Sequence, residues 1–142
     1  MHHLAIVDDN ESWCFVMAQR LEQCGYHVST FTSPRTFLPQ LRRFDLVLVD
    51  FSIPPLRYEI DVDGATLIRN IKQNVENPPI LILISSFFTA EVIEQITDLY
   101  PEADAIMGKQ VDSRELVTQI HHLLATRQPR ETDGSSPNLS IN

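Results

Sequence analysis

The residues of this chain that could do chemistry are Asp8, Asp9, Asp50, Ser85 and Lys109, and each follows a short apolar run. Carboxylates that are held close together repel and raise one another's pKa unless a cation lies among them. Mg²⁺ suits such hard oxygen ligands, because it takes one or two carboxylates and keeps several waters. A carboxylate beside a metal, with an ammonium and a hydroxyl nearby, is what phosphoryl transfer to an aspartate requires.

Each of these residues is a weak signal by itself. Acidic residues after strands often form caps and turns. The pair Ser85-Ser86 is of a common loop type, and a lone lysine is usually a solvated surface charge. The prediction of a site therefore rests on their joint placement at the ends of successive apolar runs.

Short apolar runs and amphipathic stretches alternate along the whole chain. The predicted strands are 4–7, 27–31, 46–49, 80–84 and 103–107, and the predicted helices are 13–24, 33–43, 65–75, 89–100 and 112–124. Pro39 should shorten or kink the second helix. Strict alternation with nearly apolar strands indicates an α/β fold, a parallel sheet covered by helices on both faces. In such a sheet ligands bind at the carboxyl ends of the strands, so the candidate residues should converge there.

Composition limits the classes of protein to consider. The 142 residues suggest one domain, and 43% apolar with 21% charged residues is an ordinary globular balance. A net charge of −8 disfavours nucleic acid and anionic lipid. No apolar run approaches the ~20 residues of a membrane span, and no secretory signal is visible, so we expect a cytoplasmic protein with reduced Cys14 and Cys24. Residues 1–127 should form the domain, and 128–142 a disordered polar tail.

The chain resembles the receiver domain of bacterial two-component response regulators over roughly residues 4–125. The segments that carry the resemblance are Ile6-Val7-Asp8-Asp9-Asn10, Leu46-Val47-Leu48-Val49-Asp50 with Pro54, Asp63-Gly64, Ile82-Leu83-Ile84-Ser85-Ser86, and Lys109. The resemblance is to the single-domain, chemotaxis-regulator-like type. It implies a flavodoxin-like, doubly wound (βα)5 sandwich whose five parallel strands have the order 2-1-3-4-5.

The resemblance also implies a role for each matched residue. Asp50 would accept a phosphoryl group from a histidine kinase or a phosphotransfer protein. Asp50 and Asp9 would ligate Mg²⁺ directly, Asp8 largely through water, and Ser52 through its backbone carbonyl. Ser85 and Lys109 would contact the phosphoryl group. Such a domain catalyses only its own phosphorylation and dephosphorylation, and signals to a downstream protein by direct contact, without binding nucleic acid or membrane.

Several positions depart from the family pattern. Ile106 replaces the Tyr or Phe that often serves as a switch, which puts aromatic-coupled switching in doubt. Gln110 replaces the usual proline after the lysine, so a cis peptide there is disfavoured. The loop 51–63 is longer than usual, which is consistent either with partner recognition or gating, or with a tolerated surface insertion.

Two further positions border the predicted site. Phe87 should shield an acyl phosphate from water, so it and Ser52 are expected to modulate the rate of dephosphorylation, although Phe87 could instead pack over the fourth helix. Trp13 is expected to pack in the core, and its place after the acidic cluster makes it a fluorescence reporter.

Other functions stay open at this point. The runner-up is a non-phosphorylated pseudo-receiver that acts as an interaction or dimerisation module, and the face of the fourth helix and fifth strand is where a homodimer would form. A phosphatase of the haloacid-dehalogenase type wants an aspartate at position 52, which is serine. A flavodoxin-like electron carrier would need a hydroxyl- and glycine-rich loop where the chain has Asp8-Asp9-Asn10-Glu11.

Overall fold

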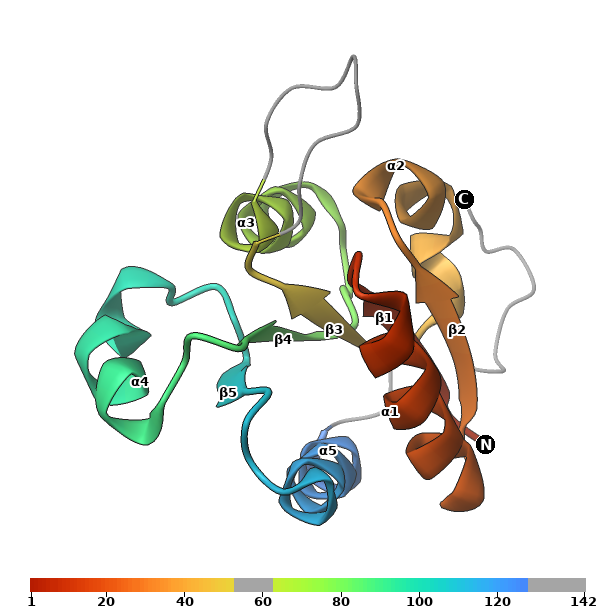
Figure 1. Ribbon diagram of the computed structural model, residues 1–142. Coiled ribbons are helices and arrows are strands. Elements are labelled where there is room, and N and C mark those ends of the chain that lie inside the picture. Colours follow the sequence, from red (N-terminus) through yellow and green to blue (C-terminus); the bar gives the residue numbers. More distant parts are fainter. Residues whose placement is uncertain (53–62, 128–142) are drawn as a thin grey trace.

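Five short parallel strands form the sheet that the alternation predicts. The structure is a computed structural model that describes residues 1–52 and 63–127. The strands are β1 (His3–Val7), β2 (His27–Phe31), β3 (Leu46–Asp50), β4 (Ile80–Ser85) and β5 (Ala105–Gly108). They pair in the order β2-β1-β3-β4-β5 (Figure 1), so the predicted fold class and strand order are confirmed.

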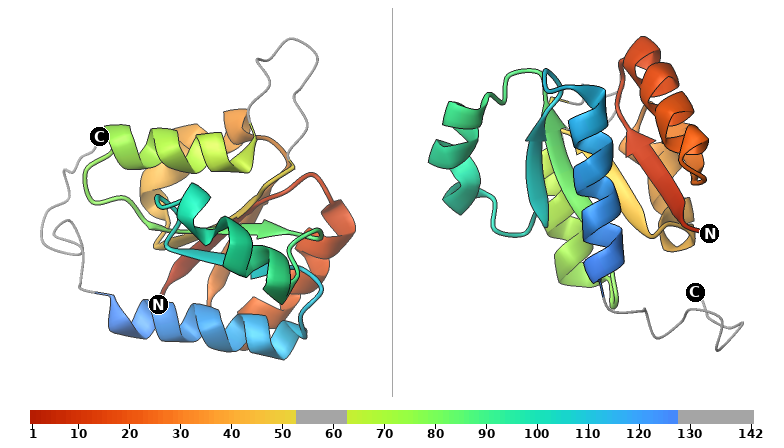
Figure 2. Two further views of the ribbon diagram at one scale, coloured as in Figure 1. Left: turned by 90° about the vertical axis from the view of Figure 1, so that its left-hand side faces the viewer. Right: turned by 90° about the horizontal axis from the view of Figure 1, so that it is seen from below.

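Helices cover both faces of the sheet (Figures 1 and 2). They are α1 (Glu11–Gln23), α2 (Pro34–Phe37) with the 3₁₀ turn η1 (Leu38–Arg43), α3 (Gly64–Asn74), α4 (Ala90–Ile96) with the 3₁₀ turn η2 (Thr97–Leu99), and α5 (Ser113–Thr126). The second helix is short, as Pro39 predicts, because proline cannot continue the backbone hydrogen bonding of an α-helix. None of the helices in the described ranges has both the length and the apolar character needed to span a bilayer.

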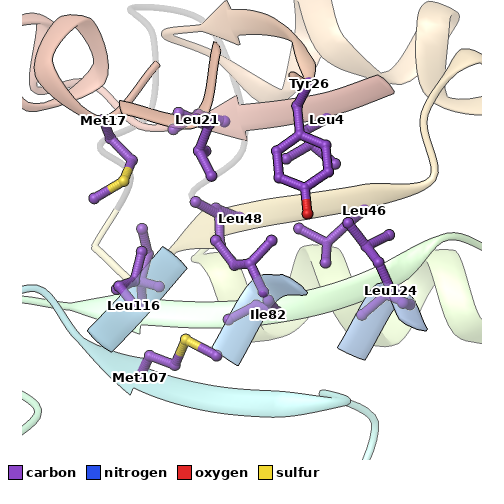
Figure 3. Packing of buried hydrophobic residues seen from close by; sticks show 14 of the residues in the cluster. Leu4, Met17, Leu21, Tyr26, Leu46, Leu48, Ile82, Met107, Leu116 and Leu124 are labelled. Carbon is purple, nitrogen blue, oxygen red and sulfur yellow. The ribbon is translucent and has the colours of Figure 1, made fainter. Parts of the chain in front are cut away.

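Alternate residues of the strands supply two cores, one on each side of the sheet. Leu4, Leu48 and Ile82 face α1 and α5 (Figure 3), whereas their neighbours such as Val7 and Val49 face α2 and α3. Successive strand residues point to opposite faces, so a central strand must be apolar throughout to be buried on both. This explains why β1, β3 and β4 read as continuous apolar runs.

Two sequence predictions about packing are wrong in detail. The apolar spacing of the first predicted helix, 13–24, puts Val16 on its inner face with Met17 and Leu21. Val16 is instead 50% exposed, and the buried residues of α1 are Cys14, Met17 and Leu21. The fifth strand begins at Ala105, two residues later than predicted. The reason is that the Ala103 N–H donates to the carbonyl of Tyr100 in a turn and is not available to the sheet.

Side-chain caps set where the helices begin, just after the carboxyl ends of the strands. Asn10 Oδ1 accepts from the Trp13 N–H at 3.0 Å, and Thr89 Oγ1 accepts from the Val92 N–H at 3.2 Å. Asp112 caps α5 in the same way. A cap satisfies an N–H that has no partner inside the helix, so the chain turns from strand to helix within a few residues.

Two parts of the sequence prediction lie outside the described residues. They are the polar tail 128–142 and residues 53–62 of the long loop. The loop's ends are described: Phe51 and Ser52 form a turn after β3, and Asp63 caps α3 by accepting from the Thr66 N–H at 2.8 Å.

Gly64 lies where the start of α3 approaches the end of β3. A Cβ at this position would lie 2.2 Å from the backbone carbonyl oxygen of Asp50. We expect Gly64→Ala to lower the free energy of unfolding by about 1–3 kcal/mol, because the added methyl group can be accommodated only if the backbone shifts. Urea denaturation would measure this loss.

The matched control is Asn70→Ala, at an exposed position of the same helix. Equal midpoints for the two variants would contradict the close approach of Gly64 to Asp50.

Candidate functional site

The candidate residues lie together at the carboxyl ends of the strands. Asp8 directly follows β1, Asp50 and Ser85 end β3 and β4, and Lys109 directly follows β5. In the parallel register Asp50 pairs with Ile84, and Ser85 with Gly108, which brings the strand ends level. The strand order reverses between β1 and β3, which is where an open α/β sheet forms its crevice.

Three carboxylates form a cluster at this edge. Asp8, Asp9 and Asp50 each offer an oxygen, and these oxygens lie within 4.8 Å of one another. Asp8 is fully buried and Asp50 is 5% exposed, whereas Asp9 is exposed to solvent. Two carboxylates therefore lie at the base of the cluster, and the third opens it to solvent.

Backbone contacts hold the buried Asp8 in place. Its N–H donates to the Phe31 carbonyl at 2.8 Å, and its Oδ1 accepts from the Asn10 N–H at 2.9 Å. Its other oxygen, Oδ2, is buried and has no aligned hydrogen-bond donor among the described residues. The close partner of Oδ2 is the Lys109 ammonium, at 2.5 Å.

Lys109 extends its ammonium into the carboxylate cluster. Besides the contact with Asp8, the ammonium lies 3.4 Å from Asp50 Oδ1, and the side chain is only 10% exposed. It also lies over the indole ring of Trp13, 4.8 Å from the ring centroid. The Trp13 contact was missed by sequence reasoning, which assigned this residue to the core. Only its position just after the acidic pair suggested that it lies near the site.

The pKa of Asp50 and the pKa of Lys109 are both raised in this cluster. Burial and then repulsion by Asp8 raise the pKa of Asp50 to about 6, against the attraction of Lys109. For Lys109, burial disfavours the charged form, but contact with Asp8 and then Asp50 outweighs this and raises its pKa. One ammonium therefore stands against three carboxylates, and the balance of charge favours a further cation.

The donor set fits a magnesium ion. Among the described residues the three candidate ligands are all carboxylates, and Mg²⁺ binds such hard oxygen ligands. Asp8 Oδ2 is also buried without an aligned hydrogen-bond donor. The buried thiol of Cys14 does not contribute a soft ligand: burial, and then repulsion by Asp8, raise its pKa to about 12. Among the described residues Cys14 and Cys24 form no disulfide.

Ser85 is buried and lies where the β4–α4 and β5–α5 loops meet. Its Oγ accepts from the Phe87 N–H at 3.1 Å, and its carbonyl accepts from the N–H groups of Phe88 and Lys109. Ser52 is exposed in the turn after Asp50. Ser85 thus shares the edge with Asp50 and Lys109.

The positions that depart from the family pattern have specific contacts. Ile106 is half-buried and lines a cavity of about 480 Å³ between α4, β5 and α5. Gln110 donates its side-chain amide to the Ser86 carbonyl at 2.7 Å, and its peptide bond to Lys109 is not cis. Phe87 is 74% exposed and does not pack over α4, unlike Phe88, which is 6% exposed.

Sequence reasoning also missed a small aromatic group beside Asp50. The ring of Phe51 lies 5.5 Å from that of Phe88 and 5.8 Å from that of Tyr100, between centroids. Phe88 directly precedes the cap of α4, and Tyr100 follows its 3₁₀ extension. The group therefore connects the end of β3 with both ends of the fourth helix.

The raised pKa of Asp50 has a consequence for stability. The folded protein binds this proton more tightly than the unfolded chain, so the stabilisation is present below about pH 4 and is lost as the pH rises through about 6. In metal-free buffer, Asp50→Asn should become more stable than wild type by about 1–3 kcal/mol at pH 7, since one pKa unit is worth about 1.4 kcal/mol. Urea denaturation between pH 4 and 8 would measure the difference.

Asp98→Asn, at an exposed position in η2, controls for the loss of one negative charge. A difference between Asp50→Asn and wild type that is constant across this pH range would contradict the assigned pKa.

Comparisons with known proteins agree with this geometry. The chain is 29% identical over 131 residues to the probable transcriptional regulator ycf27 of Cyanidium caldarium, covering 91% of this chain and 49% of that protein. It is 28% identical over 125 residues to the response regulator SaeR of Staphylococcus aureus, covering 87% and 51%. The chain thus spans about half the length of these curated relatives.

Solved structures share the fold. The non-phosphorylated HemR receiver domain from Leptospira biflexa superposes with a TM-score of 0.70 at 20% identity, covering 92% of this chain and 99% of that one. The model of the response regulator receiver domain family matches residues 4–121. The chain therefore belongs to the response regulator receiver domains, the signalling domains that accept a phosphoryl group on an aspartate in two-component systems.

Proposed function

We propose that Asp50 is the aspartate that accepts the phosphoryl group, and that the acceptance depends on Mg²⁺. The observation that carries the proposal is the buried Lys109 ammonium, 3.4 Å from Asp50 Oδ1, beside three carboxylates whose oxygens lie within 4.8 Å of one another. Asp8, Asp9, Asp50 and the backbone carbonyl of Ser52 would hold the metal. The donor would be a histidine kinase or a phosphotransfer protein.

The chemistry follows from the charges at the site. With a pKa of about 6, Asp50 is mostly ionised at neutral pH and can attack phosphorus, forming an acyl phosphate as the donor's bond breaks. The Lys109 ammonium and the Ser85 hydroxyl would contact the phosphoryl oxygens. When bound, Mg²⁺ would neutralise further charge on those oxygens.

The proposed output is contact with a downstream protein. We propose that residues 1–127 form the domain that accepts the phosphoryl group and that it acts in the cytoplasm. We propose no nucleic acid or membrane as its partner. A net charge of −8 supports the exclusion of polyanions. A homodimer through the face of α4 and β5 is a separate proposed contact, and the cavity of about 480 Å³ lies at this face.

One observation favours a second candidate, a pseudo-receiver that binds a partner without being phosphorylated. The Lys109 ammonium lies closer to Asp8, at 2.5 Å, than to Asp50, so the chain partly neutralises its own acidic cluster. Ile106 also lacks the aromatic ring that often acts as a switch in the family. The charge of three carboxylates still exceeds that of one ammonium, which favours the first candidate.

Incubation with acetyl phosphate and Mg²⁺ tests the proposal. We expect the intact mass of the wild-type protein to increase by one phosphoryl group, and Asp50→Ala and a metal-free sample to stay unmodified. Fluorescence of Trp13, the one tryptophan of the chain, reports Mg²⁺ binding separately.

Absence of the adduct, together with no change of Trp13 fluorescence on Mg²⁺ addition, would favour the pseudo-receiver. An adduct of equal yield on Asp50→Ala would exclude Asp50 as the acceptor.

Phe87 is proposed to slow the loss of the phosphoryl group. Its side chain is 74% exposed and is two residues from Ser85, whose Oγ accepts its N–H. Replacing the ring in Phe87→Asn should shorten the half-life of the phosphoprotein several-fold, because water can then approach the acyl phosphate. Mass spectrometry after removal of the donor measures the half-life.

Leu99→Asn is the matched control, since Leu99 is 62% exposed and lies in η2, away from this edge of the sheet. Equal half-lives for the two variants and wild type would contradict the shielding role.

A further inference from the structure

The Lys109 ammonium has an aromatic partner as well as its two carboxylates. It lies 2.5 Å from Asp8 Oδ2, 3.4 Å from Asp50 Oδ1 and 4.8 Å from the centroid of the Trp13 ring. A cation within about 6 Å of an aromatic centroid is attracted by the negative face of the ring, and tryptophan gives the strongest attraction. The lysine side chain is only 10% exposed, so water weakens this attraction little.

A lysine needs such a partner more than most charged residues do. Its ammonium is a point charge on a flexible four-carbon stem, and ordering that stem costs rotamer entropy. Both carboxylate partners change when the site is loaded: Asp50 would become an acyl phosphate, and Asp8 would turn to the metal. The indole is uncharged and takes no part in either change.

Trp13 is itself held by the segment that carries the acidic residues. The backbone N–H of Trp13 donates to Asn10 Oδ1 at 3.0 Å, and the backbone N–H of Asn10 donates to Asp8 Oδ1 at 2.9 Å. Its half-buried side chain packs against the core between the sheet, α1 and α5. The neighbouring Cys14 is buried, with its Sγ 3.5 Å from the Asp8 carbonyl. The indole is therefore anchored relative to the carboxylates.

We propose that Trp13 is a positioning residue for phosphoryl acceptance: its indole face holds the Lys109 ammonium at the site while the carboxylate partners are taken up by metal and phosphoryl group. This inference rests on the proposed function of Asp50. The alternative is that Trp13 only fills the core, in which case any apolar side chain of similar size would replace it.

The composition of the chain makes the contact directly measurable. It has one tryptophan and two lysines, Lys72 and Lys109, so isotope labelling of lysine gives two sets of side-chain signals. Lys72, on α3, lies 3.0 Å from Asp104 in an ion pair and serves as the internal reference. We expect the ε-methylene protons of Lys109 to be shifted upfield by the indole ring current, and to lose that shift in Trp13→Leu.

The same signals test whether the contact persists in the loaded site. With Mg²⁺ and beryllofluoride, which mimics an acyl phosphate, the upfield shift of Lys109 should remain. Its loss on loading, or a Lys109 shift in wild type equal to that of Lys72, would overturn the inference.

Kinetics separates positioning from packing. We expect Trp13→Leu to be phosphorylated by acetyl phosphate about tenfold more slowly than wild type, the loss expected for a partly desolvated cation–π contact. Trp13→Phe should recover most of that rate, because it restores an aromatic face. Phe15 is an aromatic residue of the same helix that is 64% exposed. Phe15→Leu is therefore the matched control and should be phosphorylated at the wild-type rate.

Thermal unfolding completes the design. If rate followed stability alone, wild type, Phe15→Leu, Trp13→Phe and Trp13→Leu would all fall on one line of rate against melting temperature, and this result would overturn the inference. Equal rates for wild type and Trp13→Leu would also overturn it while leaving the proposed function intact. An unmodified wild type would instead refute the proposed function, and the lysine signals would still decide whether Trp13 holds Lys109.

Discussion

The candidate site depends on the ion pairs that the Lys109 ammonium forms with Asp8 and Asp50. Lys109 brings a positive charge within 2.5 Å of Asp8 and 3.4 Å of Asp50, two carboxylates that are themselves almost inaccessible to water. Without it, these carboxylates would repel each other in a poorly solvated site, and the pKa of Asp50 would rise further above its ordinary value. The attraction of Lys109 keeps Asp50 mostly ionised at neutral pH, as a nucleophile must be.

The strand ends meet because the backbones around them approach closely. Gly64 brings the start of α3 against the Asp50 carbonyl, and Gly108 brings β5 against the Phe88 carbonyl, where an added Cβ would lie 2.0 Å away. The amide of Gln110 then joins the β5–α5 loop to the Ser86 carbonyl. The two glycines thus allow the backbones to approach closely, and the Gln110 hydrogen bond joins the loops that carry Ser85 and Lys109.

The fourth helix lies at the margin of the core in the described fold. It has no fully buried residue, and the cavity of about 480 Å³ lies on one side of it. The ring of Phe88, buried at its amino-terminal end, contacts Phe51, the neighbour of Asp50. Ile106 supplies no ring here, and among the described residues Phe51, Phe88 and Tyr100 connect the end of β3 with this helix.

The order of elements and the membership of the acidic cluster were predictable from the sequence, because both depend on short-range patterns. Continuous apolar runs predicted β1, β3 and β4, and the residues after the runs predicted the site. Tertiary structure alone decided that Cys14 rather than Val16 is buried beside Met17 and Leu21 in α1, since the two residues have similar apolar character and only packing against the sheet distinguishes them. It also decided that Trp13 lies against Lys109. That contact joins residues 96 positions apart in the sequence, and its strength depends on distance and burial, which no local pattern encodes.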